Sequence, residues 1–252
     1  MNTQRPLLKT LAVAAAGLLS LAAHAQGHAP HWGYGGHGGP AQWAELDPAF
    51  ETCAKGTSQS PINISKTEKT ELPTLDFQYG ATAPTIVNNG HTVQVNLPAG
   101  NTLRIGDRNF ELLQFHFHTP SEEQVHGKRT AMVAHFVHKN AEGALGVVGV
   151  LLQKGKRNAA FEPVFAHLPR AGEQITVDQM KLELADMLPA SKGYYAFAGS
   201  LTTPPCSEGV NWMVLKTPVQ VSQKQIDSFR QLFRFNARPV QPLRNRVIQE
   251  SI

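Results

Sequence analysis

Short runs of alternating apolar and polar residues recur along much of the chain. A period of two places successive side chains on opposite faces of a β-strand, so each run predicts a strand with one buried face. Glycine, proline and asparagine separate the runs, as in Asn89-Gly90, and these residues favour turns. The pattern predicts a mostly antiparallel sheet. The expected strands cover residues 75–79, 85–88, 92–97, 102–105, 110–118, 131–138 and 145–153.

Two segments have apolar residues at helical spacing. Residues 158–167 form the first, with Pro163 expected in the first turn, where proline is tolerated. Residues 222–233 form the second, in which Ser222 and Gln225 have the spacing of a capping box and an apolar stripe follows. We expect both helices to pack their apolar faces on the core.

The region before the first strand is rich in histidine and glycine over residues 27–40, which is typical of a mobile arm. Trp32, Tyr34 and Trp43 are too large and apolar to be left free, so part of this region is expected to pack on the domain. A short helical turn is expected at residues 44–50.

The first residues have the features of an export signal. Arg5 and Lys9 precede an apolar run over residues 11–23, and a small-x-small cleavage motif follows before Gln26. The apolar run is shorter than the roughly 20 residues that span a bilayer. We therefore expect a signal peptide over residues 1–25 that is cleaved, and a periplasmic or secreted protein with no membrane span after its removal.

Length and charge restrict the classes of protein. The chain has 252 residues, of which 41% are hydrophobic and 17% charged, and residues 26–252 suffice for a single domain with a sizeable core. Loss of Arg5 and Lys9 with the signal peptide reduces the 23 basic residues to 21, against 19 acidic ones. No lysine- or arginine-rich run occurs, so neither nucleic acid nor a membrane surface is expected as a partner.

The chain has two cysteines, Cys53 and Cys206. In an exported protein such a pair usually forms one disulfide, and the loop that it would close is long. The alternative is two buried thiols.

The most informative stretch is residues 112–138. His116 and His118 alternate with Phe115 and Phe117, so both histidines face one side of the predicted strand. A returning strand can bring His135 opposite them. Three neutral imidazoles that leave a fourth position open are typical of a catalytic zinc site.

This stretch alone leaves the fold open. A His-x-His pair followed by a carboxylate, here Glu122 or Glu123, also occurs in the metal motif of cupins, which include metal oxygenases and isomerases. A second stretch, residues 199–212, contains Thr-Thr-Pro-Pro, which presents hydroxyl groups on a rigid turn.

Further motifs distinguish the two alternatives. They are Trp32-Gly-Tyr34, Gln59-Ser-Pro-Ile-Asn-Ile64, Asn88-Asn-Gly-His91, Ser200-Leu-Thr-Thr-Pro-Pro-Cys206 and Gln241-Pro-Leu-Arg-Asn-Arg246. With the histidines, these motifs resemble those of bacterial, secreted α-class carbonic anhydrases over essentially the whole mature chain. The resemblance implies a mainly β fold, with a large central, mostly antiparallel, twisted sheet of ten strands and a few short peripheral helices. It also implies cis peptide bonds at Ser60–Pro61 and Pro204–Pro205.

The resemblance further implies zinc-dependent, reversible hydration of carbon dioxide to bicarbonate and a proton. His116, His118 and His135 match the zinc ligands, with hydroxide in the fourth position as the group that attacks carbon dioxide. Gln114 matches a hydrogen-bond acceptor for His116. The oligomeric state stays open, with a homodimer as one alternative.

Other positions match groups that assist this chemistry. Thr202 matches the residue that accepts the hydrogen of the hydroxide and passes its own proton to Glu122. His91 matches the proton shuttle, although by itself it would be read as a surface histidine after a turn. The positions that match the carbon dioxide pocket are Val137, Val147, Leu201, Thr203, Val210 and Trp212.

One position departs from the family pattern. The family usually has glutamate two residues before the third zinc histidine, where it receives the Nδ1–H of that ligand, and this chain has Val133. Valine cannot accept a hydrogen bond, so either another acceptor replaces it or zinc is held less tightly. We expect a modest weakening. A non-catalytic binding protein of the same fold is the competing function, but such proteins lose ligand histidines, and this chain keeps all three.

Overall fold

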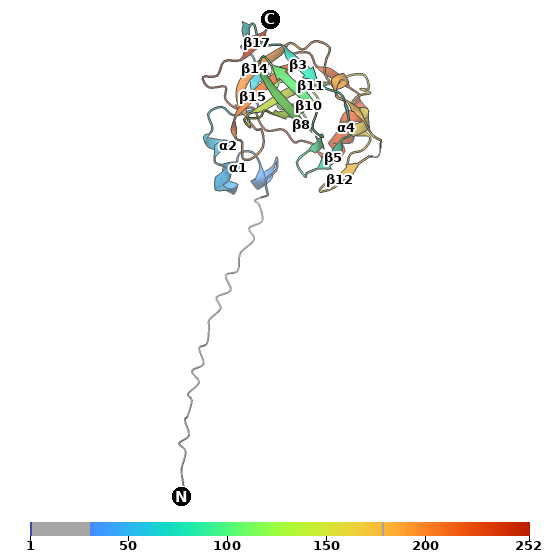
Figure 1. Cartoon of the computed structure of the whole chain (residues 1–252). Helices are drawn as coiled ribbons and strands as arrows, with labels where there is room; N and C mark the ends of the chain where they lie inside the picture. Colours follow the sequence, from blue (N-terminus) through green and yellow to red (C-terminus); the bar gives the residue numbers. More distant parts are fainter. Residues whose placement is uncertain (2–30, 178) are drawn as a thin grey trace.

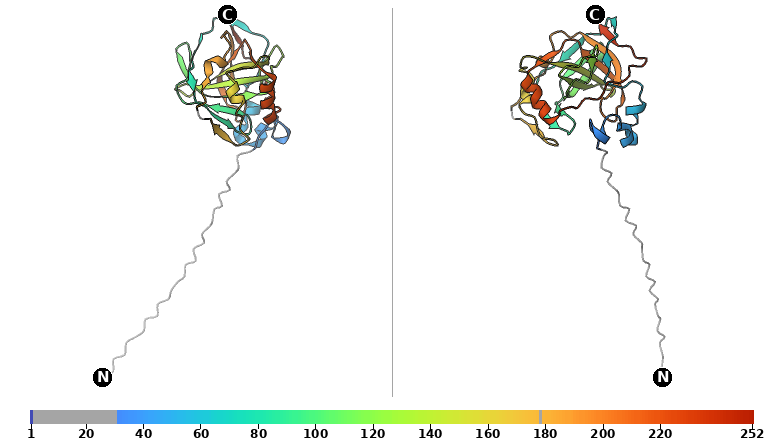
Figure 2. Two further views of the ribbon diagram at one scale, coloured as in Figure 1. Left: turned by 90° about the vertical axis from the view of Figure 1, so that its right-hand side faces the viewer. Right: turned by 180° about the vertical axis from the view of Figure 1, so that it is seen from behind.

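The computed structural model describes residues 1, 31–177 and 179–252. Nearly all of the expected signal peptide, residues 1–25, lies outside the described residues. The chain folds into strands with a few short helices around their periphery (Figure 1, Figure 2). Among the described residues, no helix has the length and apolar character needed to cross a membrane.

Most of the strands form one thirteen-stranded sheet. Its members are β2 (Glu68–Thr70), β3 (Leu75–Gln78), β5 (Thr85–Asn88), β6 (Val93–Asn96), β7 (Thr102–Ile105), β8 (Arg108–His118), β10 (Met132–Lys139), β11 (Leu145–Lys154), β12 (Gln174–Thr176), β14 (Tyr194–Ser200), β15 (Glu208–Leu215), β16 (Val219–Val221) and β17 (Gln249–Ser251). Small two-stranded sheets join β1 (Asn63–Ile64) with β9 (Gln124–Val125) and β4 (Ala81–Thr82) with β13 (Leu182–Glu183).

The order of the strands confirms the expected type of sheet. Ten of the strands form one row, β12-β5-β6-β8-β10-β11-β15-β14-β17-β2, while β3, β7 and β16 pair outside this row. The sheet is mixed, because β15 and β16 run parallel to β11 and β2 runs parallel to β17. The other pairs in the sheet are antiparallel.

The seven strands expected from alternation are all present. Five strands of the row were not predicted: β2, β12, β14, β15 and β17. Of these, β14 and β15 are the longest. The β14 sequence Tyr-Tyr-Ala-Phe-Ala-Gly-Ser is rich in small residues with weak strand preference. Pairing with β15 on one side and β17 on the other overrides this weak preference.

The helices are short. They are α1 (Trp43–Leu46), α2 (Thr52–Lys55), α3 (Glu162–Phe165) and α4 (Gln223–Leu232), with 3-10 turns η1 (Gly36–Gly38), η2 (Pro48–Phe50) and η3 (Leu184–Met187). Helix α4 confirms the prediction, because Ser222 and Gln225 form both bonds of the capping box. α1 and η2 supply the expected helical turn at residues 44–50.

A helix with Pro163 in its first turn is present as expected, but it is shorter than predicted, because α3 spans only Glu162–Phe165. The Asn158 carboxamide oxygen accepts the backbone N–H groups of Ala160 (3.0 Å) and Phe161 (3.1 Å), which stabilises a turn before the helix. Pro163 lacks an N–H group and is tolerated only in the first helical turn. The helix is therefore confined to the residues around and after Pro163.

The two faces of the central strands contact different apolar clusters. On β10, Ala134 and Phe136 belong to the larger cluster, whereas Val133 and Val137 belong to a smaller one on the opposite face. His135 shares the face of Val133 and Val137, because side chains on one face recur every two residues. The histidine side of the sheet therefore contacts the smaller apolar cluster, and the other side contacts the main core.

The N-terminal region packs against the domain as expected. Trp32, Tyr34 and Trp43 cluster with Cys53 and Cys206. The two cysteines form a disulfide with their Cα atoms 5.0 Å apart, which excludes the alternative of two thiols. The peptide bonds Ser60–Pro61 and Pro204–Pro205 are cis as expected, and Thr119–Pro120 is a further cis bond.

Candidate active site

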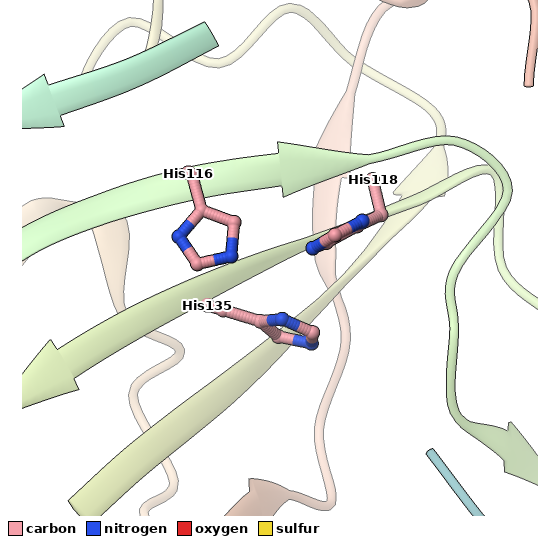
Figure 3. A group of neighbouring side chains, drawn as sticks. All are labelled: His116, His118 and His135. Atoms are coloured by element: carbon pink, nitrogen blue, oxygen red, sulfur yellow. The ribbon is translucent and has the colours of Figure 1, made fainter. Parts of the chain in front are cut away.

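Three histidines from two neighbouring strands converge on one point (Figure 3). His116 and His118 lie on β8, and the antiparallel register places His135 of β10 opposite His116. Their potential ligand atoms all lie within 4.8 Å of one another. His118 and His135 are each only 1% exposed, whereas His116 is partly exposed.

Each of these imidazoles uses one nitrogen in a hydrogen bond away from the cluster. Nδ1 of His116 lies 2.8 Å from Gln114 Oε1, and Nδ1 of His118 lies 2.7 Å from the Asn236 carbonyl oxygen. Nε2 of His135 lies 2.9 Å from Glu123 Oε1. Because these oxygens accept hydrogen bonds, they favour the tautomer in which the other ring nitrogen is free to bind a metal.

Burial controls the charge of the three histidines. Burial and repulsion from His135 lower the pKa of His116 to about 3, and the same effects lower the pKa of His118 well below its usual value. Burial also lowers the pKa of His135, but the charge and hydrogen bond of Glu123, aided by Glu122, outweigh it and raise the pKa overall. His116 and His118 are therefore neutral at neutral pH, which is the form that binds metal.

The donor set fits zinc. Three imidazole nitrogens with room for a further ligand match the usual composition of catalytic zinc sites. Nε2 of His118 is buried, points into the cluster and has no hydrogen-bond partner among the described residues. Such an orphaned buried atom is costly unless something binds it. A metal ion would satisfy it.

Glu122 lies beside the histidines. Its Oε1 accepts the backbone N–H of Arg238 at 2.7 Å, and its Oε2 lies 3.4 Å from His118 Nε2. Burial raises the pKa of Glu122 to about 7, while His135, the Arg238 N–H and the Thr202 hydroxyl favour its ionised form. Thr202 is therefore near Glu122, although Glu122 Oε2 has no hydrogen bond of ordinary length in the described part of the chain.

A cavity of about 220 Å³ opens onto the three histidines. Its apolar lining includes Val137, Val147, Leu201 and Trp212, and its polar lining includes Gln114, Thr202, Thr203 and His91. Val210 is buried in the apolar cluster behind this wall and does not line the cavity. The Trp212 ring stands edge-on to His135, with ring centroids 4.9 Å apart. The indole N–H of Trp212 donates to the Ser200 carbonyl oxygen at 3.0 Å, which fixes the ring.

His91 lines the same cavity. It follows a turn in which Asn89 Oδ1 accepts the backbone N–H groups of His91 and Thr92, both at 3.0 Å. The imidazole stacks on the Trp32 ring, with the centroids 3.6 Å apart and the planes inclined by 6°. Burial and the nearby His31 lower the pKa of His91, so the ring is neutral at neutral pH and able to take up a proton.

The comparison with known families is decisive. The model of the family described as Eukaryotic-type carbonic anhydrase, which is the α class, matches residues 38–252. The chain belongs to this family. A carbonic anhydrase from Klebsiella pneumoniae is 46% identical over 88% of this chain and 92% of the relative.

Solved structures agree with this membership. The α-carbonic anhydrase from Thermovibrio ammonificans, solved with the inhibitor sulfanilamide, has a TM-score of 0.85 and 41% identity, covering 87% of this chain and 99% of that one. Dioscorin, solved with ascorbate, has a TM-score of 0.81 and 29% identity, covering 88% of this chain and 99% of that one. A carbonic anhydrase fold thus accommodates more than one ligand, so the activity must be argued from the site.

Another carboxylate replaces the glutamate that the family has at the position of Val133. Val133 is fully buried, and Glu123 provides the carboxylate that hydrogen bonds with His135. The first of the two alternatives for this position therefore holds. The nitrogen involved is Nε2, and the expectation of Nδ1 is wrong for His135. The sequence indicates a second carboxylate near the histidines only through the pair Glu122-Glu123. The sequence analysis gave Glu123 no role toward His135.

Not every buried histidine belongs to the site. His138 also lies on β10, fully buried, but its Nε2 lies 2.5 Å from the Tyr79 hydroxyl and its Nδ1 lies 3.2 Å from the Gly146 carbonyl oxygen. Both nitrogens thus have partners within the protein. This contrast sets His118, with its orphaned nitrogen, apart from a histidine that only packs in the core.

Proposed function

We propose that this member of the carbonic anhydrase family hydrates carbon dioxide reversibly to bicarbonate and a proton, with zinc held by His116, His118 and His135. The convergence of three imidazoles, two of them buried, in the lining of a cavity with both apolar and polar residues carries the proposal. When bound there, zinc would act as a Lewis acid and make hydroxide available from water at neutral pH. The remaining steps depend on side chains of this chain.

Glu122 and Thr202 orient the attacking oxygen. The backbone N–H of Arg238 occupies Oε1 of Glu122, so Oε2 is left to accept a hydrogen bond from the Thr202 hydroxyl. An ionised carboxylate can only accept, so the Thr202 oxygen must use its lone pairs to accept a hydrogen from the attacking hydroxide. The lone pair of the hydroxide is then aimed at the substrate.

The apolar wall binds carbon dioxide. Val137, Val147, Leu201 and Trp212 offer an apolar surface beside the histidines, and Thr203 lies at its edge. Carbon dioxide has no net dipole. It therefore binds more readily to an apolar surface, from which water is easily displaced, than to a polar one. Val210 packs behind this wall, and we propose that it does not contact the substrate.

His91 carries the proton away from the site. Its imidazole lies at the cavity lining, and an imidazole titrates in the pH range that proton transfer to buffer requires. The stacking on Trp32 holds the ring in one position. Proton transfer from the histidine cluster to His91 passes through the cavity, so it requires intervening water.

Replacement of His91 by alanine tests this role. The His91→Ala variant is expected to turn over about 100 times more slowly in weak buffer, the lower end of the range for general acid–base groups. Imidazole in the buffer should restore the rate, since it replaces the missing group. Isotope exchange between carbon dioxide and bicarbonate at chemical equilibrium should stay unchanged. His167→Ala, at an exposed site, is the control. A loss that no buffer concentration repairs would assign His91 a structural role.

The proposed reaction itself is tested by stopped-flow measurement in both directions, carbon dioxide hydration and bicarbonate dehydration, on the purified protein. We expect both rates to exceed the buffer rate and to be lost together on heat denaturation. No acceleration in either direction by zinc-loaded protein would end the proposal.

We also propose that the protein works outside the cytoplasm, in the periplasm or as a secreted protein. The Cys53–Cys206 disulfide supports this, because such bonds persist mainly in oxidising compartments. Cell fractionation followed by N-terminal sequencing should recover a mature chain that begins at Gln26. An uncleaved chain in the cytoplasm would contradict this location.

A further inference from the structure

Glu123 is a buried carboxylate with a single partner. It is 1% exposed, its Oε1 lies 2.9 Å from Nε2 of His135, and its Oε2 has no hydrogen-bond partner among the described residues. Its neighbour Glu122 makes different contacts, with the Arg238 N–H and the region of Thr202. The two consecutive glutamates therefore serve different groups.

The backbone holds Glu123 firmly in this position. Ser121 Oγ donates to the Glu123 carbonyl oxygen at 2.9 Å, and the same Oγ accepts the Thr130 N–H at 2.9 Å. The next residue, Gln124, begins β9, and its N–H donates to the Ile62 carbonyl oxygen at 3.2 Å. These bonds anchor the chain on both sides of the carboxylate, so its approach to His135 does not depend on a mobile loop.

We propose that Glu123 is the positioning residue of His135: it holds the Nε2–H tautomer, directs Nδ1 into the cluster and so slows the loss of the metal. This proposal rests on zinc binding at the three histidines, as in the proposed function. Which imidazole nitrogen binds a metal is set by the hydrogen bond that the other nitrogen makes. Val133, on the same face of β10, cannot make that bond, and no other acceptor of Nε2 occurs in the described part of the chain.

Charge supports the same assignment. Glu122 and Glu123 are both buried beside the histidines, and each leaves one carboxylate oxygen without a partner. Buried charges are costly unless they are paired or lie near a metal ion. A divalent cation at the three histidines would lie near both carboxylates and would offset the cost of burying them.

The test is the rate at which each variant loses zinc to an excess of chelator, followed with a chromogenic zinc indicator. Loss of the acceptor of a ligating histidine typically costs 10–100-fold in metal affinity or activity. We expect Glu123→Ala to release zinc about 10–100 times faster than the parent. Glu123→Gln keeps the shape and an acceptor oxygen but loses the charge, so its rate should lie between the two. Gln124→Ala, in the same loop, is the matched control and should match the parent.

A double variant examines the position directly. Val133→Glu combined with Glu123→Ala moves the carboxylate to the residue two places before His135, on the same face of the strand, and should slow zinc release relative to Glu123→Ala alone. The melting temperature of each zinc-free variant separates positioning from folding. Glu123→Ala leaves the buried His135 Nε2–H without an acceptor, so it is expected to melt lower than the zinc-free parent. Glu123→Gln keeps an acceptor oxygen, so it should melt near the zinc-free parent and still release zinc faster.

Zinc release from Glu123→Ala at the parent rate would overturn the proposal. So would equal acceleration by Glu123→Ala and Gln124→Ala, or faster release from Glu123→Gln that only accompanies a lower melting temperature of its zinc-free form. If the parent itself binds no zinc, the proposed function fails instead. The two failures are therefore distinguishable.

Discussion

Alanine in place of His116, His118 or His135 is expected to abolish nearly all carbon dioxide hydration and to reduce zinc below one ion per chain. The three nitrogens converge within 4.8 Å, so removal of any one leaves an incomplete ligand set. Loss of the acceptor behind a ligand already costs about 10–100-fold, so loss of the ligand itself should exceed about 100-fold. Stopped-flow hydration assays and metal analysis on the same samples measure both effects.

His138→Asn is the matched control for these variants. It also replaces a buried histidine of β10, but one whose two nitrogens bond to Tyr79 and to the Gly146 carbonyl group. This variant should lose stability and keep its zinc. An alanine variant at any of the three cluster positions that retains both one zinc per chain and full activity would remove that histidine from the ligand set.

Removal of the disulfide is expected to lower the free energy of unfolding by about 4–5 kcal/mol in the chain-entropy model, since the bond joins residues 153 positions apart. Activity should fall as well. The Cys206 N–H donates to the Thr203 carbonyl oxygen at 2.8 Å, and Gln59 Nε2 donates to the Cys206 carbonyl oxygen at 3.0 Å. The bond therefore fastens the turn that carries Thr202 to the start of the domain.

Urea unfolding with and without reductant measures this effect, with hydration assays on the folded samples. The double variant Cys53→Ser, Cys206→Ser is the control, and reductant should change nothing further in it. If reductant leaves the unfolding midpoint of the parent unchanged while thiol titration shows both cysteines reduced, the disulfide does not stabilise the domain.

Alternation along the chain sufficed to predict seven strands, because a strand with one buried face has apolar side chains at every second position. β14 and β15 were missed because their position depends on pairing with distant strands. The helix expected at residues 158–167 is shorter for a local reason, since Pro163 has no N–H group to donate and its ring would clash with the carbonyl group four residues earlier, so the helix begins just before it. The apolar spacing alone did not set this limit.

In the candidate site, too, some features follow from the local sequence and others depend on the folded chain. The shared face of His116 and His118 follows from the strand period, but the register that sets His135 opposite His116 depends on pairing between strands. Glu123 is harder still. It lies in a loop, and no periodicity relates a loop residue to a strand residue, so its contact with His135 required the folded chain.

Zinc-dependent hydration is tested by titration of zinc-free protein with zinc, with the carbon dioxide hydration rate measured at each addition. We expect a rate near that of buffer without zinc, a linear rise, and a plateau at one zinc per chain. Full hydration activity in zinc-free protein, or one tightly bound zinc per chain with no hydration above the buffer rate, would contradict this expectation.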